Sequence, residues 1–207
     1  VPHAGWAYSG GVAAKTFAAL AQKRRPSTVV ILGAVHSWGV GRASLYARGS
    51  WDTPLGAIEV DQALAAEILQ QAQGVLVDNP RAHADEHSIE VQLPFVKHLW
   101  PEAMIVPVVV PPTEDAAAVG RVVARAVEPR RPEVILLGST DLTHYGPRYG
   151  FAPRGTGPQA LAWAKDNDRR LLDDVVYMRV NEIVRRATSE YSACGAGAIA
   201  ATVAGAQ

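Results

Sequence analysis

The sequence is poor in cysteine, balanced in charge and free of long apolar runs. Its 207 residues include one cysteine, Cys194, so no disulfide can form within the chain, which is typical of a reducing cytoplasm. Lysine and arginine together number 20, as do aspartate and glutamate, so no net charge attracts nucleic acid or an anionic membrane. No apolar run approaches the length that crosses a bilayer. We expect a cytoplasmic protein that binds neither nucleic acid nor membrane.

Two well-known kinds of catalytic motif are also missing. The glycine-rich stretch 3–11 lacks the spacing of a nucleotide-binding or dinucleotide-binding loop. No G-x-S-x-G segment offers a nucleophilic serine at a strand-to-helix turn. Nucleotide-dependent and serine-hydrolase chemistry are therefore not predicted.

The composition that remains is that of one globular domain. Apolar residues make up 48% and charged residues 19%, which is ordinary for a folded domain of this length. Val1-Pro2-His3 already lies inside a motif, and an alanine-rich run reaches Gln207. We expect residues 1–207 to form a single domain that is continued by further segments at both ends.

Short apolar runs alternate with amphipathic segments along the chain. Buried strands are predicted at 28–33, 104–110 and 134–138, with a shorter one at 75–79, and the stretch 44–56 is expected to be irregular with a hairpin around 51–56. Helices are predicted at 12–22, 61–73, 113–126, 159–173, 178–187 and 196–204, and another that begins at 86–88 and includes Val96. This alternation predicts an α/β fold with a mainly parallel central sheet flanked by helices.

Three histidines lie where the strands of this sheet end. His36 follows the strand 28–33, His144 follows the strand 134–138, and His3 lies in a similar context near the first residue. Residues beyond the carboxyl ends of parallel strands meet at one edge of the sheet, where ligands bind. Alternatively, each histidine separately caps a loop or packs in the core. Three histidines in equivalent places favour a shared site for metal binding or acid–base chemistry.

Other candidate residues each have a structural alternative. Cys194 precedes a predicted helix, whose N-terminus favours a thiolate, yet cysteine is as often a small buried apolar residue. Asp141 lies three residues before His144 and can orient it, or can form an Asx turn or helix cap. His87 lies between Glu86 and Glu90 in a pattern that suits either acid–base chemistry or helix capping. His83 and His98 are expected at the surface, without a role.

Five segments resemble the Memo family, which is called AmmeMemoRadiSam system protein B in prokaryotes. The segments are PHAGWAYSG at 2–10, LGAVH at 32–36, DEHSIEVQLPF at 85–95, STDLTHYG at 139–146 and CG at 194–195. They occur in the family's order and span nearly the whole chain, from 2 to 195. The resemblance implies the fold of class III extradiol dioxygenases of the LigB type, which are non-haem Fe(II) enzymes.

The same resemblance implies roles for particular residues. His3, His36 and Cys194 would be the metal ligands, and Asp141 and His144 would line the same pocket. His144 matches the acid–base histidine of the dioxygenases, and His87 would be a further polar group beside the site. Fe(II) is the favoured metal, although imidazole and thiolate ligands also suit copper and zinc.

Two departures from the expected pattern affect the functional prediction. Ala34-Val35 precedes His36 where a proline and a small polar residue would be expected. The dioxygenases use two histidines and a carboxylate, whereas the third position here is Cys194, and a thiolate is softer and can itself be oxidised. The pattern therefore supports a metal site better than it supports ring cleavage.

Two functions follow from the resemblance. The first is a mononuclear metal protein with redox or dioxygenase-like chemistry on a small molecule. The alternative is a non-catalytic binding or signalling module that uses the same pocket for a peptide or small anionic ligand, because animal members of the family are linked to phosphotyrosine signalling. The prokaryotic family name also suggests a radical-enzyme partner protein.

Overall fold

The computed structural model, which describes residues 1–207, is built around one five-stranded sheet. The strands are β1 (Thr28–Gly33), β2 (Ala43–Leu45), β5 (Leu76–Asp78), β6 (Met104–Val109) and β7 (Val134–Gly138), and a separate hairpin consists of β3 (Ser50–Trp51) and β4 (Ile58–Glu59). The order across the sheet is β5-β2-β6-β1-β7. All neighbouring strands are parallel except β2 and β6. The predicted α/β class and mainly parallel sheet are confirmed.

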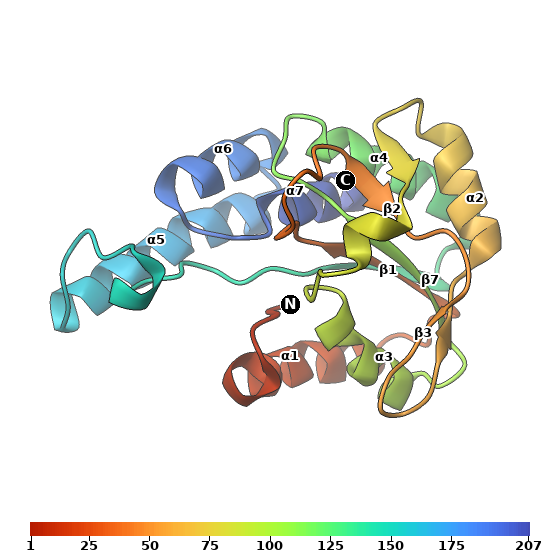
Figure 1. The fold of residues 1–207 in the computed structure, drawn as a ribbon, viewed down its shortest axis with the longest axis horizontal. Helices are drawn as coiled ribbons and strands as arrows, with labels where there is room; N and C mark the ends of the chain where they lie inside the picture. The colour runs from red at the N-terminus through yellow and green to blue at the C-terminus, as the bar shows by residue number, and fades with distance from the viewer.

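Strand β1, which lies between β6 and β7, is buried on both faces because its sequence, TVVILG, is apolar on both sides of the pleat. Val30 and Leu32 belong to a core of 31 buried residues on one face of the sheet. Val29 and Ile31, which point the opposite way, belong to a second core of 14 residues. The sheet is therefore the middle layer of three, as Figure 1 shows.

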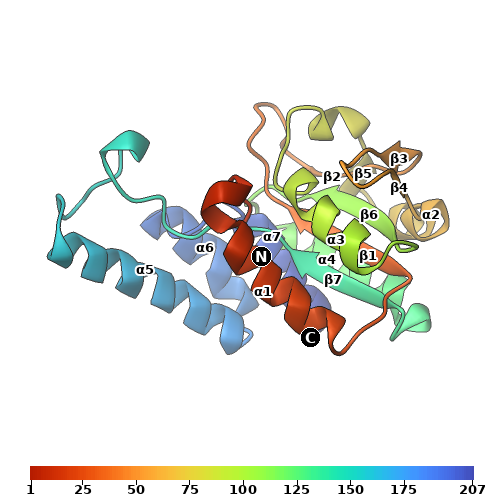
Figure 2. The ribbon, with the colours of Figure 1, turned by 90° about the horizontal axis from the view of Figure 1, so that it is seen from below.

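Helices cover both faces of this sheet. The helices are α1 (Trp6–Ala21), α2 (Gln62–Gln71), α3 (Leu93–Leu99), α4 (Ala116–Val127), α5 (Pro158–Val176), α6 (Val180–Glu190) and α7 (Ala196–Ala206). Four short 3-10 turns lie at Pro80–His83, Glu90–Gln92, Glu128–Arg130 and Pro147–Tyr149. Helices α1 and α3 lie on one face, and α2, α4 and α7 on the other; α5 and α6 extend beyond the sheet (Figure 2). None of these helices has the length and apolarity needed to cross a membrane.

Helix α7 is rich in small residues because it packs closely against α4. A Cβ atom at Gly120 of α4 would collide with the backbone carbonyl of Ala201 in α7. The close approach of these two backbones fixes α7 against the sheet. It thereby fixes the segment that precedes the helix, which contains Cys194.

Three local predictions are corrected by the structure. Helix α1 begins at Trp6 rather than at Val12, and the three-residue strand β2 lies in a stretch expected to be irregular. The helix predicted from Glu86–Ser88 begins instead at Leu93, with Pro94 in its first turn. Proline has no N–H to donate within a helix and is favoured at a helix start, so the preceding residues form turns.

Candidate metal centre

The sequence-predicted site residues meet at the carboxyl edge of the sheet. His36 follows β1, and Ser139–His144 follow β7. The first residues run beside the end of β7, because the backbone N–H of Thr140 donates to Val1 and the backbone N–H of His3 donates to Asp141 Oδ1 at 2.8 Å. Cys194 joins the same edge through its backbone N–H, which donates to the Asp141 carbonyl. The convergence expected from strand ends is confirmed.

His3 is the buried centre of this group, with 1% of its surface exposed. Its Nε2 lies 3.1 Å from Cys194 Sγ, and its Nδ1 lies 3.0 Å from Ser139 Oγ. Which nitrogen carries the proton decides which can bind a metal ion, since only an unprotonated nitrogen has a free lone pair. The partners of Ser139 settle this question.

Ser139 Oγ has one proton, and it goes to the carbonyl of Ser88 at 2.7 Å. Gln92 Nε2 donates both to the Pro2 carbonyl and to Ser139 Oγ, at 2.9 and 3.1 Å. Ser139 therefore accepts from Gln92, and its remaining lone pair can only accept from His3 Nδ1–H. Nδ1 of His3 therefore keeps its proton, and Nε2, which shares a hydrogen bond with Cys194 Sγ, is the nitrogen that can bind a metal ion once the proton of that bond is lost.

His36 is held in the same way by a carboxylate. Glu86, which is buried, accepts from the backbone N–H of His36 at 2.7 Å and from His36 Nδ1 at 3.0 Å. It also accepts from the backbone N–H of Ser88 at 2.8 Å. Such a carboxylate orients a metal-binding imidazole and leaves Nε2 as the ligand atom.

The charges of these groups reinforce one another. Hydrogen bonds to Cys194 and to Glu86 raise the pKa of His36 to about 10. Burial raises the pKa of Glu86, but hydrogen bonds from His36 and Ser88 outweigh it and lower that pKa to about 2. Without a metal ion, the centre therefore contains an imidazolium between a carboxylate and a sulfur atom.

Cys194 supplies that sulfur atom in an activated form. Burial raises the pKa of its thiol, but hydrogen bonds from His3 and His36 reverse this effect and lower the pKa to about 6. The backbone N–H of Asp141 also donates to Sγ, at 3.3 Å. The thiolate, which is the form that binds metal ions, is therefore favoured at neutral pH.

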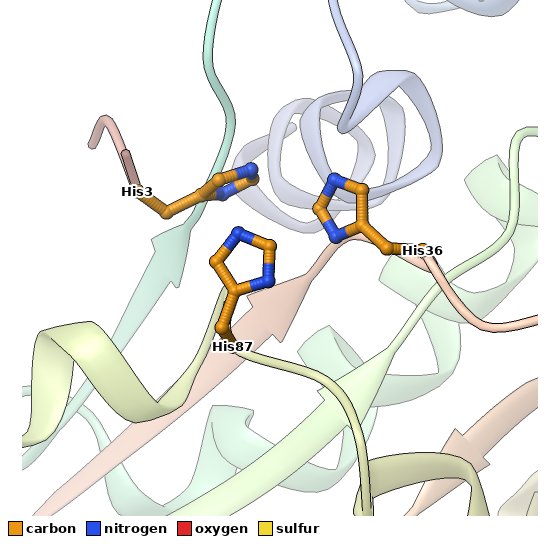
Figure 3. A group of neighbouring side chains, drawn as sticks. All are labelled: His3, His36 and His87. Carbon is orange, nitrogen blue, oxygen red and sulfur yellow. The ribbon is translucent and has the colours of Figure 1, made fainter. Parts of the chain in front are cut away.

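His87 is the third histidine of the group. Its ring is stacked on that of His36, with centroids 4.7 Å apart, and lies edge-on to the ring of His3 at 5.5 Å. Figure 3 shows the three rings around a common space. Burial and the nearby charge of His36 lower the pKa of His87, so this half-exposed ring is kept neutral.

Two overlapping sets of side chains have the spacing of metal ligands. In each set, one donor atom per residue lies within 4.8 Å of the others: His3, His36 and His87 form one set, and His3, Asp141 and Cys194 form the other. His3 belongs to both. Imidazole and thiolate donors suit borderline divalent ions, so the residues present fit a metal centre.

Asp141 lies beside His3 and Cys194, and His144 lies next to Asp141. Asp141 Oδ1 accepts from the backbone N–H groups of His3 and Ala4, and its Oδ2 lies 3.8 Å from His144 Nε2. Asp141 thus joins distant segments instead of forming the Asx turn or cap considered above. His144 is stacked on Tyr149 and lines a cavity of about 390 Å³ that reaches Cys194.

Sequence reasoning missed the residues that orient the histidines. Ser139 and Gln92 hold His3, and Glu86, which the pattern paired with His87, is bound chiefly to His36. All three lie inside the quoted motifs, which was the available signal. His83 was expected at the surface but is buried, with its Nε2 donating to the Ser44 carbonyl; His98 is exposed as expected.

The chain is similar to known proteins over nearly its whole length. Residues 1–207 match the family model described as Memo, Memo-like protein. A MEMO1 family protein of Methanopyrus kandleri is 37% identical over 209 residues, covering 98% of this chain and 68% of the relative. Similar proteins of Thermococcus onnurineus and Methanothermobacter thermautotrophicus are 35% and 36% identical, each over 98% of this chain and over 72% and 69% of their own lengths.

Proposed function

The chain belongs to the Memo family, and we propose that it holds one non-haem metal ion on His3, His36 and Cys194. The observation that carries this proposal is the pair of oriented imidazoles beside a thiolate. His3 Nε2 and Cys194 Sγ are 3.1 Å apart, and both histidines have Nδ1 fixed by an acceptor. Oriented titratable groups with strongly shifted pKa values, as in His36 and Cys194, are typical of functional sites.

Fe(II) is the favoured ion, with copper and zinc as alternatives. Two imidazoles and one thiolate suit all three metals, so the donor set restricts the class of ion and leaves the choice within it to geometry and supply. A bound iron would supply redox chemistry towards oxygen and an electron-rich substrate.

The chain's own residues provide a place for such a substrate. The cavity of about 390 Å³ beside Cys194 is lined by aromatic and apolar side chains, among them Tyr149, Phe151 and Tyr191, with His144 in its wall. Mostly apolar and aromatic walls with a few polar groups are typical of sites for small molecules. His144, 3.8 Å from Asp141, would accept or donate the proton of a substrate hydroxyl, with Asp141 stabilising its charged form.

The test begins with metal-free protein titrated anaerobically with Fe(II), and with Co(II) as a spectroscopic substitute. We expect one equivalent to bind, with a thiolate-to-metal charge-transfer absorption that disappears in Cys194→Ser. Absence of binding would refute the metal site, and binding without that absorption in the wild-type protein would refute Cys194 as a ligand.

The same Fe(II)-loaded protein tests the chemistry. Oxygen consumption with a catechol, lost in His144→Ala while metal binding is retained, supports dioxygenase-like turnover. Binding of an aromatic acid or phosphotyrosine peptide without oxygen consumption would instead support a non-catalytic binding module. Neither result bears on the metal site itself, which is tested separately by the metal titration.

A further inference from the structure

His87 occupies a position that neither the thiolate site nor the acid–base pair explains. Its ring faces those of His3 and His36, and the three present one nitrogen each within 4.8 Å of the others (Figure 3). A divalent ion bound to histidine is about 2.0–2.1 Å from each nitrogen, so two nitrogens of a tetrahedral site are about 3.4 Å apart. The three nitrogens, which lie within 4.8 Å of one another, would have to approach by at most about 1.4 Å.

We propose that His87 is a metal ligand that completes an all-histidine donor set with His3 and His36, able to hold a divalent ion without Cys194. This inference rests on the proposed function for two of its three ligands, His3 and His36. It differs from that function in assigning His87, instead of Cys194, as the third ligand. His3 and His36 are then shared by two ligand sets, one completed by Cys194 and the other by His87.

The structure leaves His87 free to bind in this way. Glu86 Oε1 is 3.8 Å from its Nδ1, which is too long for a hydrogen bond. Half of its side chain is exposed, and it comes from the turn that precedes the 3-10 segment Glu90–Gln92. A small rotation of this ring toward the ion would therefore break no hydrogen bond and displace no core residue.

The chemistry of three imidazoles also differs from that of the thiolate site. Three neutral nitrogens are the donor set of well-known zinc sites that keep a fourth position open, and they suit copper, iron and nickel as well. An ion held in this way carries no thiolate charge. We expect it to remain bound, more weakly, when the sulfur ligand is lost.

The experiment uses Co(II) and the full 207-residue chain, freed of metal. Co(II) is titrated into wild type, Cys194→Ser, His87→Ala and the double variant, with His98→Ala as the matched control because His98 is an exposed histidine in α3. Affinity is read from competition with a chelating dye and ligand type from the absorption spectrum. Circular dichroism confirms that each variant is folded.

We expect Cys194→Ser to keep one Co(II) with lower affinity and without the sulfur charge-transfer band. Adding His87→Ala should then weaken binding further, by at least the roughly 10–100-fold that loss of an outer partner of a ligand costs, while His98→Ala changes nothing. Equal affinity of Cys194→Ser and the double variant would overturn the proposal, as would no binding at all to Cys194→Ser. A wild-type protein that lacks the charge-transfer band would instead count against Cys194, whatever His87 does.

Discussion

Glu86 lies beneath His36, and its replacement by glutamine tests whether this carboxylate supports both the fold and the metal centre. The two carboxylate oxygens accept three N–H groups: the backbone and Nδ1 of His36 and the backbone of Ser88. Glutamine has the same shape but only one acceptor oxygen, and its NH₂ group would face a donor. At least one N–H is then left unpaired, and a buried unpaired group costs about 1–3 kcal/mol.

The contribution of Glu86 to the free energy of unfolding follows from its pKa. Burial raises this pKa, but the hydrogen bonds from His36 and Ser88 lower it overall from its ordinary value of 4.5 to about 2. At about 1.4 kcal/mol per pH unit, the ionised carboxylate contributes about 3 kcal/mol to the free energy of unfolding. Because the folded pKa is depressed, this contribution is complete above the unfolded pKa and is lost as the pH falls through the folded pKa.

The assay is urea unfolding of the metal-free protein at about pH 7 and about pH 3. We expect Glu86→Gln to be less stable than wild type by about 3 kcal/mol at neutral pH, with the difference falling to less than half at acid pH. Co(II) affinity at neutral pH should fall roughly 10–100-fold because His36 loses its orienting partner. The control is Glu90→Gln, an exposed carboxylate four residues away. If both variants behave alike in stability and in metal affinity, the reasoning about Glu86 is wrong.

Three other predictions concern separate parts of the structure. Ser139→Ala removes the acceptor of His3 Nδ1, so Co(II) affinity should fall roughly 10–100-fold with the fold retained. Isothermal titration measures this affinity, and an unchanged value would contradict the assignment of the proton to His3 Nδ1. Hydrogen bonds to Cys194 and Glu86 raise the pKa of His36 to about 10, so metal binding must release its proton. Co(II) affinity should therefore rise about tenfold per pH unit from 7 to 9, and an affinity that does not change with pH would exclude a protonated His36. Gly120→Ala drives a Cβ into the Ala201 carbonyl and should cost about 1–3 kcal/mol in urea unfolding, whereas Gly11→Ala, with open space in α1, should be neutral or stabilising by up to about 1 kcal/mol.

The sequence was sufficient to predict those strands whose structure is determined by burial alone. The strands β1, β6 and β7 are continuous apolar runs, and their carboxyl ends could be located well enough to group His36 with Asp141 and His144. Strand β2 escaped prediction because Ala43–Leu45 has no period of its own. It is a strand because β5 and β6 supply hydrogen-bonding partners on either side, which no local pattern reveals.

The site could be predicted by residue type but not by orientation. The family motifs identified His3, His36 and Cys194, and the structure shows that they lie close together. The partners Ser139 and Glu86 depend on backbone groups brought together by tertiary contacts, such as the carbonyl of Ser88. Such contacts join residues about 50 positions apart, and single-sequence patterns do not encode them.

The contact between His3 and Cys194 joins atoms 3.1 Å apart from residues 191 positions apart in the chain. The folded chain brings these two ligands together, whereas an unfolded chain would have to close a loop of this length to do so. By the chain-entropy treatment of cross-links that closure costs about 5 kcal/mol at 25 °C, so the ion binds the folded chain far more tightly and stabilises it by mass action. Loss of the ion would then make the whole molecule easier to unfold and to digest with proteases. Metal supply would thereby control the lifetime of the protein.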